Sequence, residues 1–510
     1  MYKCLYNLEL LILATAKTPW QDYDQPIQKD SPANFVRRLE GTDVDALMIC
    51  PTAWKRVMWH SKVDPHWEKE AAKIPTPYFT ADLKYHEKAY FRLRDYMLAG
   101  NDPVAQTVEQ AKKQGIAPFI SFRMNEAHWH LQESSPMHSS FWKNNPQFRI
   151  SENNKCFNYI HAEVRDHYFA LLSELVENYD VAGLELDFMR HPFYFSKEDL
   201  DQGREIMTGF IARVRQMLNE WGAKRNKKLQ LSVRVPCTVK WANEVGLDVG
   251  RWDREGLIDM VNISPFFMSS TGLDVSGYKS IVNHAATYGE IHFILENTEL
   301  RNGFINNCTR KMNRQMYRAL AATFLDEGFD GISLFNFDYT GHHFFNEPRR
   351  NHLKEGLPPH DVLVGITNPE QLAKQDKHYF VGPYYTSLPM KNTLDLDIYI
   401  ADTNPSGDFG QALLRIKTEK PCECIEIEAQ VNGVPVEEVT WMGELFPPQS
   451  IEGVAKPEQV KYYKVPVEIL KHGNNHITAQ NKVDECLQRD RMATYNMVEL
   501  ALYKNNPFLS

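Results

Sequence analysis

The chain has 510 residues, of which 43% are hydrophobic and 24% charged, the composition of an ordinary globular protein. Single domains typically have about 100–200 residues and barrels about 250 or more, so the length predicts one large and one smaller domain. The net charge of -9 argues against nucleic acid as a partner, because phosphate backbones are bound by clustered lysine and arginine. It still allows a small anion to be bound by a few arginines.

Eight short strand-like segments occur in the first two-thirds of the chain, and helix-like stretches separate most of them. They are Leu5–Glu9, Ala46–Cys50, Pro118–Arg123, Gly183–Asp187, Leu229–Arg234, Asp259–Ile263, His292–Glu296 and Gly331–Asn336. Strands that alternate with helices indicate a parallel sheet. Eight such repeats predict an α/β fold, a (β/α)8 TIM barrel, over residues 1–345.

The N-terminal segment is interpreted as the first barrel strand and not as a signal peptide. Leu10–Leu13 and the following Ala-Thr-Ala imitate a signal peptide with its cleavage site. However, Asn7 and Glu9 interrupt the apolar run, and removal of the segment would leave the barrel one strand short. No run of about 18 or more apolar residues occurs elsewhere, so we expect no transmembrane helix. The sequence does not fix the compartment: cytoplasmic without a leader, periplasmic or secreted if one has been removed.

The eight cysteines form no CxxC pair and no zinc-binding spacing. Cys4, Cys50 and Cys237 fall in or beside apolar segments, as Cys156 does less clearly, and are expected to be buried free thiols. Cys422 and Cys424 would share one face of a strand. We therefore expect no bound metal and no cofactor.

Two long segments follow the second and third strands, Pro51–Asp102 and Asn125–Ala162. They carry several aromatic residues and a histidine: Trp54, Trp59, Trp67, Tyr78, Trp129, His130, Phe141 and Trp142. Loops of this length inside a compact domain are usually functional. We expect them to form the walls of a pocket at the catalytic end of the barrel. The alternative is that they cover hydrophobic surface or make a dimer contact.

The last third of the chain changes pattern. Residues 346–392 are rich in proline and polar residues and are expected to be a connector. Residues 393–510 contain alternating segments and a hairpin signal, Asn432-Gly433, which together predict a β-sandwich. The alternating segments are Leu394–Ile400, Cys424–Ala429, Val465–Leu470 and Met497–Leu502. Without an obvious aromatic sugar platform, we expect this domain to brace the barrel or to build a homodimer.

Polar and charged residues follow most of the predicted strands, at the end of a barrel where active sites lie. These candidate residues are Glu9, Arg123, Asn125, His128, Asp187, Arg190, Arg234, Glu296 and Asn336. Residues of this kind suit an enzyme that cleaves glycans. Those on the rim, including Asn125, Arg234, Glu296 and Asn336, are expected to contact substrate, although a rim residue could also simply cap a loop.

Arg123 and His128 are the strongest local signal. An arginine at a strand end is costly to bury unless it meets an anion, and its planar fork suits a carboxylate. His128, in the loop that follows, is of a type that exchanges a proton near neutrality. The alternative is an arginine–carboxylate strut beside an ordinary loop histidine.

Three carboxylates at strand ends are candidates for acid or base chemistry. Glu185 and Asp187 alternate along one strand and face the same way, with Arg190 just beyond. Asp187 either positions arginines or acts as acid or base, since many glycosidases use two carboxylates. Glu9 is a candidate general base, and its alternative role is a salt bridge to a barrel arginine.

Three stretches resemble the inverting exo-sialidases of glycoside hydrolase family 156, a bacterial family. They are Phe122-Arg-Met-Asn-Glu-Ala-His-Trp, Gly183-Leu-Glu-Leu-Asp-Phe-Met-Arg and Leu334-Phe-Asn. The likeness covers the whole barrel in the same order, with similar separations. Its most specific local element is the spacing from the arginine to the histidine.

The resemblance implies a sialidase that works by a single displacement on a sialylated glycan. In that family a histidine is the Brønsted acid, a first-strand aspartate is the base and arginines bind the sialic acid carboxylate. The resemblance therefore implies that His128 is the acid, that Arg123 and Arg190 bind the carboxylate and that Asn336 binds ligand. The family's aspartate falls near Glu9, and the longer side chain there is a departure from the pattern.

Other functions remain open at this stage. One is a hydrolase or lyase for another acidic glycan, and another is a barrel that binds glycan without cleaving it. A metal-dependent hydrolase could use the His128-Trp-His130 pair together with Asp187 and His292. Tyr194 or Tyr339 could act as a nucleophile, as in other sialidases.

Overall fold

The computed structural model describes residues 1–16, 18, 20, 25–73, 85–128, 133–297, 308–340, 360–419, 426–441, 445, 460–482 and 493–505. The chain divides into two compact units. The first comprises Met1–Phe266, Asp274–Glu290 and Ser333–Pro348, and the second comprises Phe267–Leu273, Ile291–Ile332 and Arg349–Ser510.

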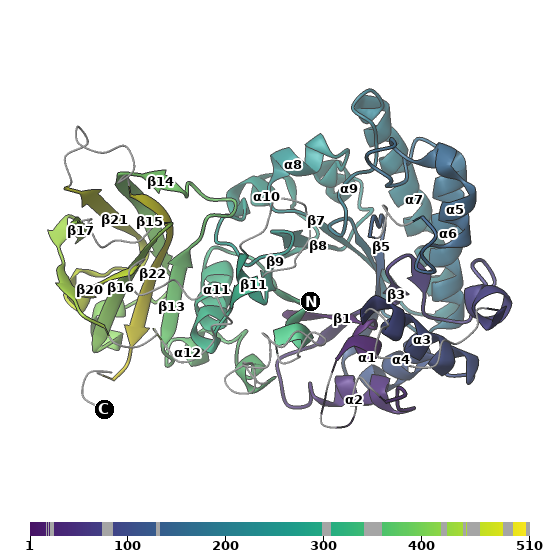
Figure 1. Ribbon diagram of the computed structural model, residues 1–510, viewed down its shortest axis with the longest axis horizontal. Helices are drawn as coiled ribbons and strands as arrows, with labels where there is room; N and C mark the ends of the chain where they lie inside the picture. The colour runs from purple at the N-terminus through teal and green to yellow at the C-terminus, as the bar shows by residue number, and fades with distance from the viewer. Residues whose placement is uncertain are drawn as a thin grey trace. The chain divides into compact units, whose positions relative to one another are not determined.

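Eight parallel strands close into a barrel, which confirms the predicted (β/α)8 fold (Figure 1). In spatial order they are β1 (Cys4–Glu9), β12 (Gly331–Phe335), β9 (Ala286–His292), β8 (Met260–Ser264), β7 (Gln230–Pro236), β6 (Gly183–Asp187), β5 (Ala117–Arg123) and β2 (Ala46–Cys50). Almost every strand residue is buried, as expected for a parallel sheet covered by helices. The N-terminal segment is a barrel strand, as predicted.

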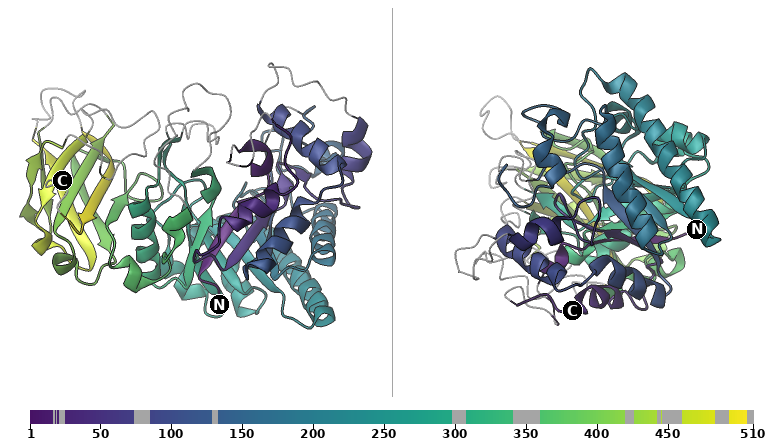
Figure 2. Two further views of the ribbon diagram at one scale, coloured as in Figure 1. Left: turned by 90° about the horizontal axis from the view of Figure 1, so that it is seen from below. Right: turned by 90° about the vertical axis from the view of Figure 1, so that its right-hand side faces the viewer.

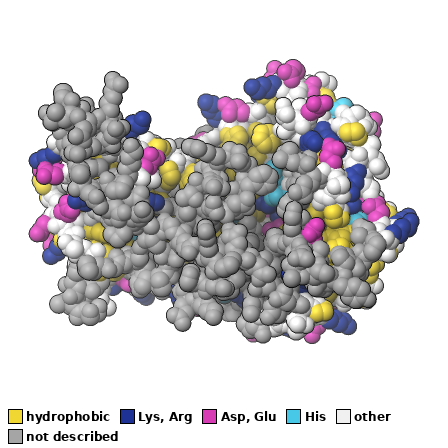
Figure 3. Space-filling model, in the orientation of Figure 1, with side chains coloured by type: hydrophobic (Ala, Val, Ile, Leu, Met, Phe, Trp, Pro, Cys, Tyr) yellow, Lys and Arg dark blue, Asp and Glu magenta, His cyan; other side chains and the backbone are white. Residues whose placement is uncertain are grey.

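Helices follow the barrel strands and lie outside them (Figures 1 and 2). They are α1 (Ile12–Thr15), α2 (Ser31–Arg37), α3 (Tyr85–Leu98), α4 (Pro103–Lys113), α5 (Ser140–Asn144), α6 (Ala162–Asn178), α7 (Leu200–Arg225), α8 (Val239–Glu244), α9 (Val249–Arg254) and α10 (Val275–Ile281). A further helix, α11 (Arg314–Asp326), belongs to the second unit. Among the described residues, no helix combines the length and the apolar character needed to cross a membrane. On the face drawn in Figure 3, the visible acidic and basic side chains are interspersed.

The prediction for the seventh barrel strand is wrong. The strand is β9, Ala286–His292, whereas most of the predicted segment forms β10 (Ile294–Asn297), which pairs with β11 (Cys308–Lys311) in a separate two-stranded sheet. The apolar run Phe293-Ile-Leu gave the stronger sequence signal. β9 carries Tyr288 and Glu290, which are fully buried, and these polar residues hid its strand pattern.

The strand register sets the barrel interior in layers and so positions the candidate site. Arg123 is aligned with Asp187, and Asp187 with Arg234, on the adjacent strands β5, β6 and β7. Two residues earlier, Ser121, Glu185 and Ser232 are aligned in the same way. Because side chains alternate along a strand, both sets project to the same face. Polar side chains that are far apart in the sequence therefore meet inside the barrel.

The C-terminal sandwich is also confirmed. One sheet contains β13 (Lys377–Val381), β22 (Thr494–Tyr503), β16 (Gln411–Thr418), β20 (Val460–Val465) and β19 (Glu437–Val439), with β14 (Met390–Lys391) paired to β22. The other contains β15 (Thr393–Ile400), β21 (Gly473–Asn481), β17 (Ile427–Val431) and β18 (Val434–Pro435). A continuous set of buried apolar side chains from both sheets forms the core.

Details of the sandwich differ from the sequence expectation at two places. The expected connector, residues 346–392, supplies the strands β13 and β14. The segment Val465–Leu470 is not a strand: β20 ends at Val465, and a short 3-10 turn, Val467–Ile469, follows Pro466. Proline has no N–H for a strand ladder, which accounts for this end. The expected hairpin at Asn432-Gly433 joins β17 to β18, with φ of 51° and 79°.

Candidate active site

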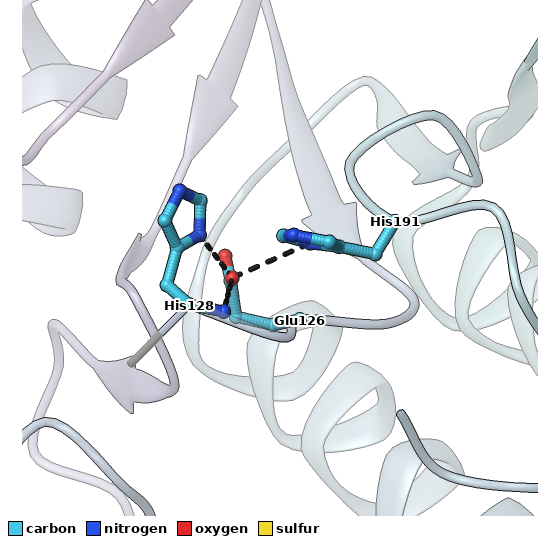
Figure 4. Close-up of side chains that lie close together, drawn as sticks. All are labelled: Glu126, His128 and His191. Atoms are coloured by element: carbon cyan, nitrogen blue, oxygen red, sulfur yellow. Dashed lines mark hydrogen bonds and ion pairs between the residues drawn. The ribbon is translucent and has the colours of Figure 1, made fainter. Parts of the chain in front are cut away.

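The centre of the candidate site is the carboxylate of Glu126, in the loop after β5 (Figure 4). Its Oε1 accepts the backbone N–H of His128 at 2.9 Å and also contacts Nδ1 of the same histidine. Nδ1 of His191, in the loop after β6, lies 3.4 Å from the same oxygen. The carboxylate therefore lies between two imidazole rings that come from neighbouring loops.

Hydrogen bonds define the protonation of both histidines. Arg190 Nη2 lies 2.9 Å from His128 Nε2, and since a guanidinium can only donate, Nε2 must accept. Nδ1 of His128 then carries the proton and donates it to Glu126. The N–H of Ala127 donates to His191 Nδ1 at 3.2 Å, so that nitrogen also lacks a proton. Both rings are neutral in this arrangement.

The electrostatic surroundings agree with these assignments. Burial lowers the pKa of His128 below its ordinary value, and Arg190 lowers it further, while Glu126 acts in the opposite direction. Burial lowers the pKa of His191 well below its ordinary value. Burial disfavours the charged form of Glu126, but the hydrogen bond from His128 and the positive charge of Arg123 outweigh it and hold its pKa well below the usual range.

Arg123 joins Glu126 to the end of the first strand. Its Nη2 donates to Glu9 Oε1 at 2.5 Å, and its Nη1 donates to Glu126 Oε2 at 3.3 Å. All three side chains are almost completely buried. The expected role of Arg123 as a substrate contact stays a prediction. In that role, the anion of the substrate would compete with the two carboxylates that Arg123 already contacts. The geometry also matches the strut that the sequence left open for Glu9.

A second charge network lies on the next strands of the barrel. Arg234 donates to Asp187 Oδ1 at 2.8 Å and makes a two-bond contact with Glu290, at 2.5 and 2.8 Å. It also donates to Ser264 Oγ at 2.9 Å, and its guanidinium lies 3.7 Å from the centre of the Phe335 ring. The Arg234 side chain is 1% exposed. Although Arg234 was expected to contact substrate, all of these contacts are with protein groups.

Asp187 and Glu185 occupy the adjoining interior positions. Asp187 Oδ1 also accepts the N–H of Met189 at 2.8 Å, so its expected acid or base role stays a prediction. Glu185 accepts hydrogen bonds from Ser121, Ser232 and Asn262 at 2.7–3.3 Å. Burial raises the pKa of Glu185 to about 7. These hydrogen bonds hold both carboxylates in the interior of the barrel.

Asn125 and Lys55 fix the loops that carry Glu126 and His128. The Asn125 amide donates to the carbonyls of Phe157 and Phe193, at 2.9 and 2.7 Å, and accepts the N–H of Phe157. Lys55 Nζ donates to the His128 carbonyl at 2.5 Å. Asn125 was expected to contact substrate, and its described bonds instead join the loops after β5 and β6.

The described parts of the long segments after β2 and β5 pack against the protein more than they line a cavity. Trp59, Trp67 and Trp142 are at most 1% exposed. A cavity of about 40 Å³ lies beside Arg123, Glu126, Trp54 and Lys55. Such a volume holds water, whereas small-molecule sites have about 300 Å³ or more. The alternative that these segments cover hydrophobic surface fits these tryptophans.

Several other candidate residues are placed by the structure or lie outside its described part. Asn336 directly follows β12, is 8% exposed and has a φ of 54°. Tyr194 is buried and donates to the Phe188 carbonyl at 2.7 Å. His292 is buried at the end of β9, in the second unit. The side chains of Glu296 and Tyr339, and the residues Tyr78, Trp129, His130, Cys422 and Cys424, lie outside the described part.

Two site residues had no assigned role at the sequence level, Glu126 and His191. Glu126 stands two residues before the candidate acid, and His191 directly follows Arg190. Such proximity to candidate residues was the available signal. It could not show that the two loops meet, which follows from the pairing of β5 with β6.

Glu126, His128 and His191 are also close enough to hold a metal, since their ligand atoms lie within 4.8 Å of one another. Two histidines and a carboxylate are ligands that suit zinc. Their contacts fit a metal poorly, because both nitrogens of His128 and Nδ1 of His191 already have protein partners. The guanidiniums of Arg123 and Arg190 also lie 3.3 and 3.8 Å from the same carboxylate and add positive charge.

No protein-family model and no curated protein matches this chain. Solved structures with a similar architecture include a glycoside hydrolase family 18 N-acetylglucosaminidase from Paenibacillus barengoltzii, with 9% identity, 71% of this chain and 99% of that chain covered, and a TM-score of 0.37. An alpha-L-fucosidase from Paenibacillus thiaminolyticus has 12% identity, covering 94% and 96%, with a TM-score of 0.37. A chitinase from Bacillus thuringiensis has 9% identity, covering 94% and 98%, with a TM-score of 0.41. All three are glycoside hydrolases, and likeness at this level carries no argument about activity.

The structure predicts that Arg234 acts on stability more than on substrate binding. Arg234→Met should lower the free energy of unfolding by about 3–5 kcal/mol, because it leaves Asp187 and Glu290 buried without their cation. Burial already raises the pKa of Glu290, and loss of its cation would raise it further, so the deficit should shrink as the pH falls and Glu290 becomes neutral. Denaturant unfolding at several pH values measures this.

Arg213→Met is the matched control, since Arg213 is an exposed residue of α7 paired with Asp166. It should stay within about 1 kcal/mol of the parent protein. A stable Arg234→Met protein with a raised KM would instead support the expected contact with substrate.

Proposed function

We propose that this protein is a glycoside hydrolase for an acidic sugar, namely an exo-sialidase that releases terminal sialic acid with inversion. The observation that carries the proposal is the meeting of His128 Nε2 and Arg190 at 2.9 Å, beyond the carboxyl ends of β5 and β6. A sialoside has its carboxylate on the anomeric carbon. An arginine that binds this anion therefore orients the glycosidic oxygen toward a nearby proton donor.

In the proposed reaction a single displacement forms one bond and breaks another at the anomeric carbon. A water oxygen attacks that carbon, and Glu9 takes a proton from the water, while the bond to the leaving oxygen breaks. The leaving oxygen takes the proton of His128 Nε2. The products are sialic acid with inverted configuration and the free alcohol of the remaining glycan. Acid and base in such enzymes stand about 6.5–9.5 Å apart to admit the water.

The sequence resemblance to the family 156 sialidases supports these assignments residue by residue. His128 matches the acid, and Arg190 matches an arginine of the carboxylate clamp. The structure adds Glu126, which contacts Nδ1 and stabilises an imidazolium, as the aspartate of a catalytic triad does. Asn336 is the further proposed ligand contact, and Asp187 is the base next in line if Glu9 is only a partner of Arg123.

One observation favours a second candidate function, a lyase for another acidic glycan. His128 Nε2 is unprotonated in the structure and lies beside a guanidinium, which suits removal of a proton next to a sugar carboxylate. A lyase forms an unsaturated sugar that absorbs ultraviolet light, and a hydrolase does not. Incubation with polyuronides therefore separates the two functions.

The proposed function predicts turnover of fluorogenic and natural sialosides, with the inverted anomer formed first and no loss of activity with a chelator. The absence of metal dependence is expected because the guanidiniums of Arg123 and Arg190 lie beside the Glu126 carboxylate and disfavour a further cation. Proton NMR before mutarotation identifies the first product. Appearance of the retained anomer first excludes a single displacement, and loss with a chelator that zinc restores would favour the metal-dependent alternative.

His128→Ala should abolish turnover of natural sialosides but slow activated aryl sialosides much less. A good leaving group needs little protonation, whereas a sugar alcohol needs the acid, whose contribution is typically about 10²–10⁴-fold. Steady-state kinetics on both substrate types measure the difference. Equal losses on both would mean that His128 binds substrate and does not act as the acid.

Glu9→Gln should retain the fold and lose turnover by several orders of magnitude, because the amide is nearly isosteric but cannot take a proton from water. Glu9→Asp should keep partial activity, since it restores the residue type of the family with a shorter reach. Kinetics and thermal unfolding are measured together. A fully active and stable Glu9→Gln protein would move the base to Asp187, and an active but unstable one would make Glu9 a strut for Arg123.

A further inference from the structure

Arg190 donates a hydrogen bond to Nε2 of His128, the ring nitrogen that must carry the donated proton in the proposed reaction. Its Nη2 donates to His128 Nε2 at 2.9 Å, while Nδ1 of the ring faces Glu126. A protonated Nε2 and a guanidinium are both donors and cannot share this contact. The structure therefore holds His128 in a form that cannot yet protonate a leaving group.

We propose that the carboxylate of the substrate binds Arg190, which releases His128 Nε2 and allows this nitrogen to be protonated. The freed nitrogen takes up one proton from solvent, and this is the proton that it later donates to the leaving oxygen. No bond of the sugar changes in this step. The inference rests on the proposed function, because it needs a substrate whose anion lies beside the glycosidic oxygen.

Arg190 is more exposed to an incoming anion than Arg123 is. Its side chain is 11% exposed, compared with 3% for Arg123. Its Nε lies 3.8 Å from Glu126 Oε2, too far for a hydrogen bond. Arg123, by contrast, bonds Glu9 at 2.5 Å. An incoming anion at Arg190 therefore competes with an imidazole nitrogen, whereas at Arg123 it competes with the Glu9 carboxylate.

The charged and titratable groups that face His128 favour the same direction of change. Among the described residues they are Glu126 at Nδ1, Arg190 at Nε2, Arg123 bonded to Glu126 and to Glu9, Lys55 at the backbone carbonyl, and His191, whose ring centre is 5.0 Å away. His191 is neutral, since its Nδ1 accepts an N–H. Arg190 and Arg123 thus oppose an imidazolium and Glu126 supports it directly, so one added anion shifts the balance toward the protonated ring.

The test measures the titration of His128 itself by NMR of histidine-labelled protein, with the signal assigned by its loss in His128→Gln. N-acetylneuraminic acid should move the midpoint to higher pH, while its methyl ester, the same sugar without the charge, should leave it unchanged. Binding of the acid with an unchanged or lowered midpoint would overturn the inference and leave the sialidase proposal standing. If the acid does not bind, the proposed function fails, and the inference fails with it.

Variants separate the two contacts of the ring. In Arg190→Gln the midpoint of the free protein should rise, because a cation at Nε2 is lost, and the response to the acid should disappear. Its KM for sialosides should rise roughly 10- to 150-fold, as expected for a charge-assisted contact of about 1.5–3 kcal/mol. An unchanged response to the acid in Arg190→Gln would overturn the inference. Arg213→Gln, an exposed arginine of α7, is the matched control and should behave as the parent protein does.

Glu126→Gln should lower the His128 midpoint with and without the acid, since it removes the carboxylate that supports the imidazolium. Its sialidase activity should fall most at neutral and higher pH. A purely structural role would lower stability without moving the midpoint, so thermal unfolding is measured on the same samples. If the variant does not fold, the Arg190→Gln titration decides the inference alone.

Discussion

The burial of one carboxylate, that of Glu126, determines how the candidate site is built. Transfer of an ionised carboxyl from water to a protein interior costs several kcal/mol unless positive groups and hydrogen bonds compensate it. Glu126 receives this compensation from β5, through Arg123, from its own loop, through His128, and from the loop after β6, through Arg190. The need to satisfy a single side chain thus draws two loops together and brings an acid–base group beside an arginine.

The interior of the barrel separates charges that stabilise from charges that are available for chemistry. Arg234 is 1% exposed and contacts two carboxylates and a hydroxyl, so a ligand cannot reach it without breaking the network. Arg190 is more exposed, donates to an imidazole nitrogen and lies 3.8 Å from a Glu126 carboxylate oxygen, too far for a hydrogen bond. An arginine held by a neutral acceptor gives up less when an anion arrives. The two arginines therefore differ in their surroundings, although the sequence shows each simply near the end of a strand.

The sequence could predict the parts of this structure that depend on local pattern. Ala46–Cys50 and Gly183–Asp187 coincide with β2 and β6, and the Asn432-Gly433 turn forms where its conformational preferences place it. β9 escaped prediction because its inward side chains include a tyrosine and a glutamate, which hide the apolar pattern of a buried strand. β9 is a strand because it pairs with the neighbouring barrel strands, and its own residue pattern does not show this.

The ion pairs of the site were beyond sequence reasoning for a related reason. Glu9 and Arg123 were recognised as strand-end residues, but their contact depends on barrel closure across 114 positions of the chain. Likewise, the sequence does not show that Glu126 lies near Arg190, because that proximity depends on the pairing of β5 with β6. Which of several carboxylates meets which arginine is decided by strand register. The sequence therefore could not decide whether Glu9 and Asp187 form structural ion pairs or act as acid or base.

A histidine acid poses a problem that a carboxylic acid does not. Burial raises the pKa of a carboxyl and keeps its proton in place, but it lowers the pKa of an imidazole and removes the proton that an acid must donate. Glycosidases that use a buried glutamic acid therefore have their acid ready before substrate binds. In the proposed reaction His128 needs negative charge nearby, and Glu126 supplies only part of it against the cations that face the ring. An anionic substrate supplies the remainder. A neutral glycoside that entered the same site would leave the histidine unprotonated, so selection for an acidic sugar would operate at the proton transfer as well as at binding.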